Sequence, residues 1–400
     1  MFANADRAQA LLVYGRTSPE PGPRAHSLFL LRPDTLPEGA VRQHPRYHTT
    51  GMRGVQLGGL DPIDCPVDAR RRVGAEGAGL EIALRSFQVT RTLLPGVLTG
   101  ILDTALRIAV RFASERRLYS RPVASLPLVR ARLADAYGDL LLAEGFARVA
   151  LRSLHLLPDQ AVTHAAAVKY LVPRLVVAGV NTLAGVLGAS GYLREGEHAY
   201  FQKLVRGAQP STFGHASGIS CLMTLLSYLP GRGRAALRSG VPAVPAEVFR
   251  LSDPLPEVPW ARLGLGGGPA DALLAAFPGD AAQSPPGAAP VAELSRTWEA
   301  LVKDCAALRA ADLGVAAPVA TYELARRYTV LLAAGSTLGV WRHAGAVDGA
   351  TAPLAAAALT RAARLIGPGR PLAAELREDL VNEAVRRVES GAPLYEPGQE

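Results

Sequence analysis

The loop sequence PSTFGHASGIS, residues 210–220, places one imidazole between two stretches of helical character. Imidazole changes its charge near neutral pH, so His215 is a candidate general base. Neighbouring loop residues point in different directions, however, and a partly buried or solvent-facing histidine without a chemical role is the alternative interpretation.

The composition is that of a globular chain without the marks of a metal-binding or nucleic-acid-binding protein. Hydrophobic residues make up 49% of the chain, and the formal net charge of +8 is spread along it without a basic run. A solvated surface explains this charge, although the charge could also favour anionic ligands such as nucleotide phosphates. The three cysteines, Cys65, Cys221 and Cys305, are too far apart to indicate a disulfide framework or a zinc site. We therefore expect no metal, no nucleic-acid partner and a reducing compartment.

The apolar stretches of the chain indicate buried helices. The N-terminal sequence MFANADRAQA has neither the basic start nor the apolar run of a signal peptide. The two most apolar stretches are residues 171–190 and 328–341. The first is interrupted by Pro173, Arg174 and Asn181, and the second is too short to span hydrocarbon. We therefore expect no membrane insertion and a cytoplasmic location.

Residues 1–75 predict a small β domain. The short apolar runs QALLVYGRT and HSLFLLRP are separated by the turn-forming sequence SPEPGPRA, and GMRGVQLGGL and DPIDCPVDA continue in short strands punctuated by Gly and Pro. Three or four such strands make a small sheet. Its first strand begins close to Met1, so the sequence before it offers nothing to cover that edge. We interpret this segment as a partial domain.

Residues 76–230 change to a helical period. The apolar positions of the first long helix recur at intervals of three or four: Val97, Ile101, Ala105, Ile108 and Phe112. A second long helix follows from residue 126, and a third, at 160–187, is apolar nearly all round. Shorter helices fit 196–206 and 216–229. This pattern predicts an antiparallel bundle of long helices.

Residues 231–290 are rich in Gly and Pro and indicate a linker or a loosely packed arm, with one helical island near 270–277. Residues 291–400 return to the helical period. The helices expected there include 318–341, 352–365 and 371–389, the last ending at Ser390-Gly391. The chain is thus predicted to be α+β and mostly α, with a partial small β domain, a long-helix antiparallel bundle and an additional C-terminal helical region.

Three segments together resemble the acyl-CoA dehydrogenase family over about residues 45–230. GMRGVQLGGLDPIDCPVDARRRVGAEGAGLEIAL is similar to the end of the family's β domain, where a GxRG turn, a V-P element and G-x-G-x-G precede the first long helix. ASERRLYSRPVASLPLVRARLAD resembles the Arg–aromatic–Pro signature of the bundle, and LGASGY, residues 187–192, resembles the LGG-x-G-aromatic turn. The resemblance implies a flavoprotein that binds FAD and oxidises the CH–CH bond of an acyl thioester.

The resemblance also carries functional positions onto this sequence. Arg91 matches an arginine that lies near the acyl-CoA in relatives, and Arg116 matches one that reaches the FAD of a neighbouring subunit. A guanidinium group suits a pyrophosphate because it stays charged and offers a planar fork of donors. The alternative is that each arginine is an ordinary charge on a helix surface. Tyr119 takes the place of an aromatic residue near the flavin. Gly188 and Gly191 match the turn at which the backbone approaches the cofactor closely.

Two departures from the family pattern put the usual reaction in doubt. TFGHASGIS aligns with the family's aromatic-Glu-Gly-Thr segment, so Gly214 replaces the catalytic Glu, with His215 beside it. Thr90 occupies the alternative position of the base in some relatives. A base must remove the α-proton while the β-hydrogen leaves as hydride to the flavin, and both of its known positions are vacant. In addition, the helical domain and the first half of the sheet in relatives have no counterpart in this sequence.

The resemblance and its departures leave several functions open. The first is a degenerate acyl-CoA dehydrogenase-like flavoprotein acting on acyl-CoA or on a carrier-protein-bound acyl thioester. Such a chain is expected to form homo- or hetero-oligomers, with a partner chain supplying the missing N-terminal half. The alternatives are a non-catalytic scaffold or binding subunit without flavin, a recruited biosynthetic activity, and a chain whose reading frame begins earlier.

Overall fold

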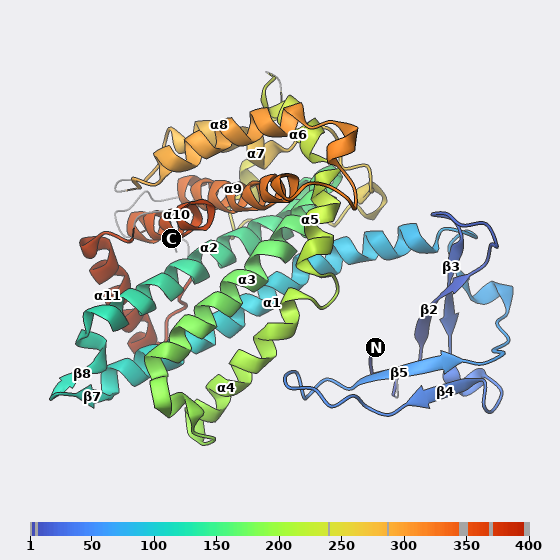
Figure 1. Cartoon of the computed structure of the whole chain (residues 1–400), viewed down its shortest axis with the longest axis horizontal. Coiled ribbons are helices and arrows are strands. Elements are labelled where there is room, and N and C mark those ends of the chain that lie inside the picture. Colours follow the sequence, from blue (N-terminus) through green and yellow to red (C-terminus); the bar gives the residue numbers. More distant parts are fainter. Residues whose placement is uncertain are drawn as a thin grey trace. The chain divides into compact units, whose positions relative to one another are not determined.

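The chain divides into two compact units, Met1–Phe87 and Gln88–Glu400. The computed structural model describes the following parts of the chain: residues 2–4, 7–238, 241–285, 288–343, 351–367 and 371–395. Most of the described strands lie in the first unit, joined by long loops, and the second unit is mostly helical (Figure 1). The division falls inside the first long helix, α1.

The first unit contains two small antiparallel sheets. Their strands are β1 (Phe2–Ala3), β2 (Leu11–Arg16), β3 (His26–Leu31), β4 (Val41–His44), β5 (Leu57–Pro62) and β6 (Arg72–Val73). One sheet has the order β1-β5-β4 and the other β2-β3-β6. The β2–β3 pair is a hairpin whose register runs from Leu11 opposite Leu31 to Arg16 opposite His26, and its connection contains the predicted turn sequence. The two apolar runs near the N-terminus therefore form strands, as predicted.

The first unit buries few apolar side chains. In its described part these are Ala25, Leu28, Leu31 and Ala40. By contrast, Leu12 and Tyr14 on β2 are 64% and 42% exposed. Because β2 pairs only with β3, its other edge has no neighbouring strand among the described residues. The unit therefore has a thin apolar interior and an open edge.

Long helices build the second unit. They are α1 (Gly79–Glu115), α2 (Pro127–Leu156), α3 (Ala161–Leu187), α4 (Gly196–Ala208), α5 (Gly218–Leu226), α6 (Leu229–Ala236), α7 (Ala272–Ala281), α8 (Val291–Ala307), α9 (Val319–His343), α10 (Ala352–Ile366) and α11 (Ala374–Ser390). Most of their places agree with the helical periods of the sequence, and the fold class is confirmed. The helix predicted at 216–229 is the shorter α5, and α6 lies mostly where a linker or arm was predicted. The last helix ends where predicted, with Gly391 in the left-handed conformation at φ 72°.

The apolar core lies between these helices, with α3 buried along most of its length. Close approach of α1 and α3 depends on Gly179, because a Cβ atom there would lie 2.7 Å from Leu102 Cδ1. The predicted apolar face of α1 is buried at Ala105 and Ile108. Val97 on the same face is instead 70% exposed, so this end of the predicted face does not reach the core.

The segment 231–290 is more ordered than its composition indicates. Val248, Phe249 and Phe277 are buried in the main core, and the ring of Phe249 fills the space that a side chain at Gly339 would need. The expected helical island is a full helix, α7. Gly and Pro set the turns of this segment, while the apolar residues between them still gain free energy from burial. The segment therefore packs against the bundle and is not a loose arm.

Two helical segments, Gly79–Glu115 and Pro158–Tyr192, are long and apolar enough to cross a membrane by length and composition alone. The share of the most apolar window that is buried is 50% in the first and 56% in the second. A core helix of a bundle passes the same test. The absence of membrane insertion therefore stays a prediction.

Candidate functional site

The loop between α4 and α5, which carries Gly214, lies beside a group of cations. Lys169 of α3 is only 2% exposed, and its Nζ donates a hydrogen bond of 2.5 Å to the Ser211 carbonyl oxygen. Burial lowers the pKa of the Lys169 ammonium, and the charges of Arg91 and Arg174 lower it further. No ion pair to Lys169 or Arg174 occurs among the described residues. We call Arg91, Lys169 and Arg174 the cationic cluster.

Cys221 of α5 lies against the cationic cluster and is fully buried. Burial raises the pKa of its thiol, and Arg91, Lys169 and Arg174 oppose this change only in part. The thiol therefore stays protonated near neutral pH and is not an activated nucleophile. Sequence analysis missed Lys169, whose signal was a charged residue, one of two with Arg174, inside the apolar stretch that forms α3.

The turn at Gly214 is shaped for a residue without a side chain. The Gly214 N–H donates a hydrogen bond of 2.7 Å to the Pro210 carbonyl oxygen. A Cβ atom at Gly214 would lie 3.0 Å from the same oxygen, so any side chain requires a small shift of the turn. The structure thus offers no carboxylate at the position that the family pattern marks for the base. At the alternative position, Thr90 is half-buried on α1.

His215 follows Gly214 on the exposed side of the loop. Its φ is 62°, in the left-handed region, and Phe213 beside it is 64% exposed. No hydrogen bond to the imidazole occurs in the described part of the chain. A general base acts at a fixed distance from the proton that it removes, and nothing here fixes the imidazole.

Arg116 lies immediately after the last residue of α1. Its 25-residue separation from Arg91 corresponds to about 37 Å along a helix axis, so the two guanidinium groups cannot hold one pyrophosphate. Arg116 is exposed, and its guanidinium makes no hydrogen bond or ion pair to the described residues. It is therefore available to a ligand or to another subunit.

Tyr119 occupies the tip of a small hairpin that follows Arg116. The hairpin pairs β7 (Arg117–Leu118) with β8 (Arg121–Pro122) through two residues of positive φ, Tyr119 at 49° and Ser120 at 64°. Two-residue turns of this kind match the twist of their strands. The Tyr119 side chain is 88% exposed. The turn therefore holds an aromatic ring out in solvent.

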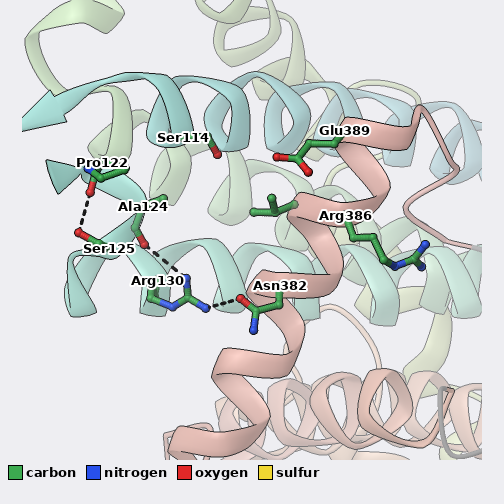
Figure 2. Close-up of a pocket in the computed structure, with 9 residues that line it drawn as sticks. Ser114, Pro122, Ala124, Ser125, Arg130, Asn382, Arg386 and Glu389 are labelled. Atoms are coloured by element: carbon green, nitrogen blue, oxygen red, sulfur yellow. Dashed lines mark hydrogen bonds between the residues drawn. The ribbon is translucent and has the colours of Figure 1, made fainter.

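A pocket of about 430 Å³ lies beside this hairpin, between the end of α1, the start of α2 and α11 (Figure 2). Its polar wall includes Arg130, whose guanidinium donates a hydrogen bond of 2.8 Å to Asn382 Oδ1. Ser114 and Glu389 lie on opposite sides of the pocket. This wall suits a polar ligand. Sequence analysis missed this pocket because α11 lies outside the residues that carry the family resemblance.

Gly188 and Gly191 form the turn after α3. Gly188 has a φ of 53°, and a Cβ atom there would meet nothing within 4 Å, so the turn needs glycine for its conformation. The Gly191 carbonyl oxygen accepts a hydrogen bond of 2.7 Å from Gln202 Nε2. The following helix, α4, contacts the end of α1 through an Arg111–Glu197 ion pair. This turn therefore lies at the same end of the bundle as Arg116.

The predicted site residues thus fall into two groups. Arg91 belongs to the cationic cluster, which lies beside the Gly214 loop. The residues of the second group share the far end of the bundle with the pocket: Arg116, Tyr119, Gly188 and Gly191.

A buried polar network joins α3, α6 and α9 to the segment before α7. Asp271 Oδ2 lies 3.2 Å from His164 Nε2 and accepts a hydrogen bond from the Tyr328 hydroxyl, while Oδ1 accepts one from the Leu274 N–H. Burial alone would raise the pKa of Asp271, but His164 and Arg232 hold it well below its usual range. All of these polar side chains are at most 2% exposed. We interpret the network as structural.

Comparison with known proteins gives a match over the first helices of the bundle. Residues 77–218 match the family model described as acyl-CoA dehydrogenase, C-terminal domain. Over 194 residues the chain is 28% identical to cyclohex-1-ene-1-carbonyl-CoA dehydrogenase of Geobacter metallireducens, covering 48% of this chain and 50% of that protein. The chain spans half the length, or less, of the first curated relatives that it matches.

Two solved structures show the likeness in fold. The acyl-CoA dehydrogenase of Bacillus anthracis, complexed with FAD, has a TM-score of 0.62 at 15% identity and covers 98% of this chain and 66% of that one. The prolyl acyl carrier protein oxidase AnaB has a TM-score of 0.52 at 20% identity, with 57% of this chain and 58% of that one covered. At these identities the likeness concerns the fold alone.

Proposed function

We propose that the chain, whose residues 77–218 match the C-terminal domain of acyl-CoA dehydrogenases, is an acyl-CoA dehydrogenase-like flavoprotein with an incomplete active site. In this proposal the bundle binds FAD and an acyl thioester, and the chain cannot remove the α-proton by itself. The observation that carries the proposal is the Gly214 turn, which holds no carboxylate inside a segment, 77–218, that matches the family model.

The exposed residues at the far end of the bundle fit a cofactor held between subunits. The guanidinium of Arg116 has no partner among the described residues, and it would bind the pyrophosphate of FAD. The Tyr119 ring, held out by the β7–β8 turn, would pack against the same ligand. Gly188 has no side chain to cover the backbone at this end of the bundle. When bound, FAD supplies the acceptor for a hydride from the substrate.

The other end of the bundle explains why the usual reaction would fail. The loop between α4 and α5 carries no Asp or Glu, and the ionisable groups nearest to it include the cations Lys169 and Arg174. A charged cation cannot accept a proton. Removal of the α-proton would then need a base from a ligand or from another chain. The acyl group could be carried by CoA or by a carrier protein, and AnaB, a prolyl acyl carrier protein oxidase, is an example of the second kind.

We further propose that the first unit is completed by a partner chain. Its described part buries only four apolar side chains and leaves β2 with a free edge and an exposed Leu12 and Tyr14. An interior of this size gives little hydrophobic stabilisation, so added strands would stabilise it. Homo- or hetero-oligomers follow from this proposal. A cytoplasmic location fits the three cysteines, all of which are free.

The absorbance spectrum of the purified chain tests flavin binding. We expect the bands of oxidised flavin, at one FAD per chain or per pair of partner chains. Addition of an acyl-CoA under anaerobic conditions should leave them unbleached, because the loop holds no carboxylate and nothing fixes the imidazole of His215. A colourless protein that takes up no added FAD would support the alternative, a scaffold subunit without flavin, which the vacant positions Gly214 and Thr90 favour.

Replacement of Gly214 tests the vacant base directly. In the oligomer proposed above, the flavin held by a neighbouring subunit would meet this loop, so Gly214→Glu should restore slow bleaching of that flavin by an acyl-CoA, because it returns a proton acceptor to the loop. Gly214→Gln is the matched control, since it imposes the same shift of the turn and adds no base. Equal bleaching by both variants, or bleaching by the unmodified chain, would refute the assignment.

A further inference from the structure

A cavity of about 200 Å³ lies in the second unit between α2, α3, α9 and α10. These four helices pack against one another, and α5 packs against α3 (Figure 1). Apolar side chains form much of its wall, among them Leu171 and Leu175 of α3 and Val330 of α9. At about 30 Å³ for each non-hydrogen atom, as in liquid water, the cavity holds a molecule of about six or seven such atoms. It lies apart from the residues assigned above to cofactor binding.

Three arginines also line this cavity, and two of them are neutralised. Arg361 donates to both oxygens of Asp139, at 2.8 and 2.9 Å, so this carboxylate is fully engaged. Arg326 is paired in the same way with Glu323, at 2.7 and 2.6 Å. Arg174 is different, since no ion pair to it occurs among the described residues. One uncompensated positive charge therefore remains in the wall.

The surroundings of Arg174 increase this positive charge. Its guanidinium lies over the ring of Tyr170, 3.9 Å from the ring centroid, and donates a hydrogen bond of 2.8 Å to the Tyr170 carbonyl oxygen. It also packs against Gly218, the first residue of α5, where the helix dipole is positive. The ammonium of Lys169 is close enough for Arg174 to lower its pKa. Arg174 thus brings its charge to the wall with Lys169 and a helix N-terminus close by, and neither cation forms an ion pair in the described part of the chain.

We propose that this cavity binds a small organic carboxylate, with its carboxylate on the Arg174 guanidinium and a short aliphatic tail against Leu171, Leu175 and Val330. A carboxylate matches the planar donors of a guanidinium and neutralises the one surplus charge. The apolar wall disfavours a phosphate dianion, which loses more hydration and meets no second unpaired cation there, because Lys169 does not line the cavity. Because α9 and α10 complete the wall, the site depends on helices outside the segment 77–218.

Calorimetric titration of the full chain with butyrate tests the site, with ligand-observed NMR as a second readout. We expect saturable binding at one site. Arg174→Gln keeps a planar side chain over Tyr170 but removes the charge, and it should weaken binding by about tenfold or more. Arg309→Gln is the matched control, because this side chain is 83% exposed, lies outside the cavity and should leave binding unchanged.

A second variant keeps the test decisive if Arg174→Gln does not fold. Ala178→Leu places a larger side chain in the cavity from an exposed position on α3, where leucine is a good helix former, and should abolish binding with Arg174 intact. Far-UV circular dichroism verifies the fold of each variant. The proposal is overturned if the unmodified chain shows no saturable binding, if neither variant changes it, or if inorganic phosphate or uncharged butanamide binds as tightly as butyrate.

Discussion

Removal of the Asp271 carboxylate should be among the most damaging single changes in the second unit. The carboxylate caps the N-terminus of α7 through Leu274 and accepts hydrogen bonds inside the core from α9 and α3. In Asp271→Ala the cap is lost, at a cost of about 1 kcal/mol. The buried Tyr328 hydroxyl loses its acceptor, at about 1–3 kcal/mol.

The largest cost comes from the charges that Asp271 balances. Arg232 is 1% exposed and its charge helps to lower the pKa of Asp271, so the variant removes a negative charge that offsets this buried cation. Loss of one partner of a buried charged pair costs about 3–5 kcal/mol. The three losses overlap and are not additive, so we expect the free energy of unfolding to fall by about 4 kcal/mol. This is a large part of the about 5–15 kcal/mol of a typical domain.

Urea unfolding followed by tryptophan fluorescence measures the fall in the free energy of unfolding of the second unit. All three tryptophans, Trp260, Trp298 and Trp341, belong to the second unit, so the first unit does not contribute to the signal. Ser217→Ala is the matched control, because Ser217 caps the half-buried start of α5 and does not belong to the buried polar network. It should cost about 1 kcal/mol. Equal losses for the two variants would refute the view that Asp271 holds a buried polar network.

Three further changes test other parts of the structure. Glu383→Gln should destabilise the chain at pH 7 but not near pH 2, because Arg386 and Arg387 lower the pKa of Glu383 to about 2 and its contribution is lost as the pH falls through that value; urea midpoints across pH measure this. Gly179→Ala should cost about 1–3 kcal/mol by overpacking against Leu102, read from the same urea curves. Val97→Ser should leave stability within about 0.5 kcal/mol, since Val97 is 70% exposed, and a larger loss would show that this face is covered.

The long helices could be predicted from the sequence because their signal is local. Apolar residues at intervals of three and four place α1, α2 and α3 within a few residues, and Ser390-Gly391 marks the end of α11. The segment 231–290 could not be read in this way. Its Gly and Pro content indicates a linker, while its buried residues find their partners far along the chain, as Phe249 does at Gly339.

The polar groups inside the core escaped prediction for a related reason. His164 and Asp271 are 107 residues apart, and Lys169 meets the Ser211 carbonyl oxygen 42 residues further on. No spacing rule connects such pairs, because only the packing of α3 against later segments brings them together. By contrast, the absence of a carboxylate in the α4–α5 loop was visible in the sequence, since an absent residue type needs no partner to be detected.

The C-terminal helices share one core with the bundle. Arg361 of α10 crosses α2 directly over Gly138, where a Cβ atom would lie 2.7 Å from Arg361 Cγ, and this close crossing lets its guanidinium reach Asp139. Arg364 reaches Asp135 one turn earlier on α2, at 2.7 Å. Buried ion pairs contribute little net stability, but a mismatched register would leave charges unpaired, at a high cost. These pairs therefore set how α10 lies on α2, and with it the shape of the cavity that Arg174 lines.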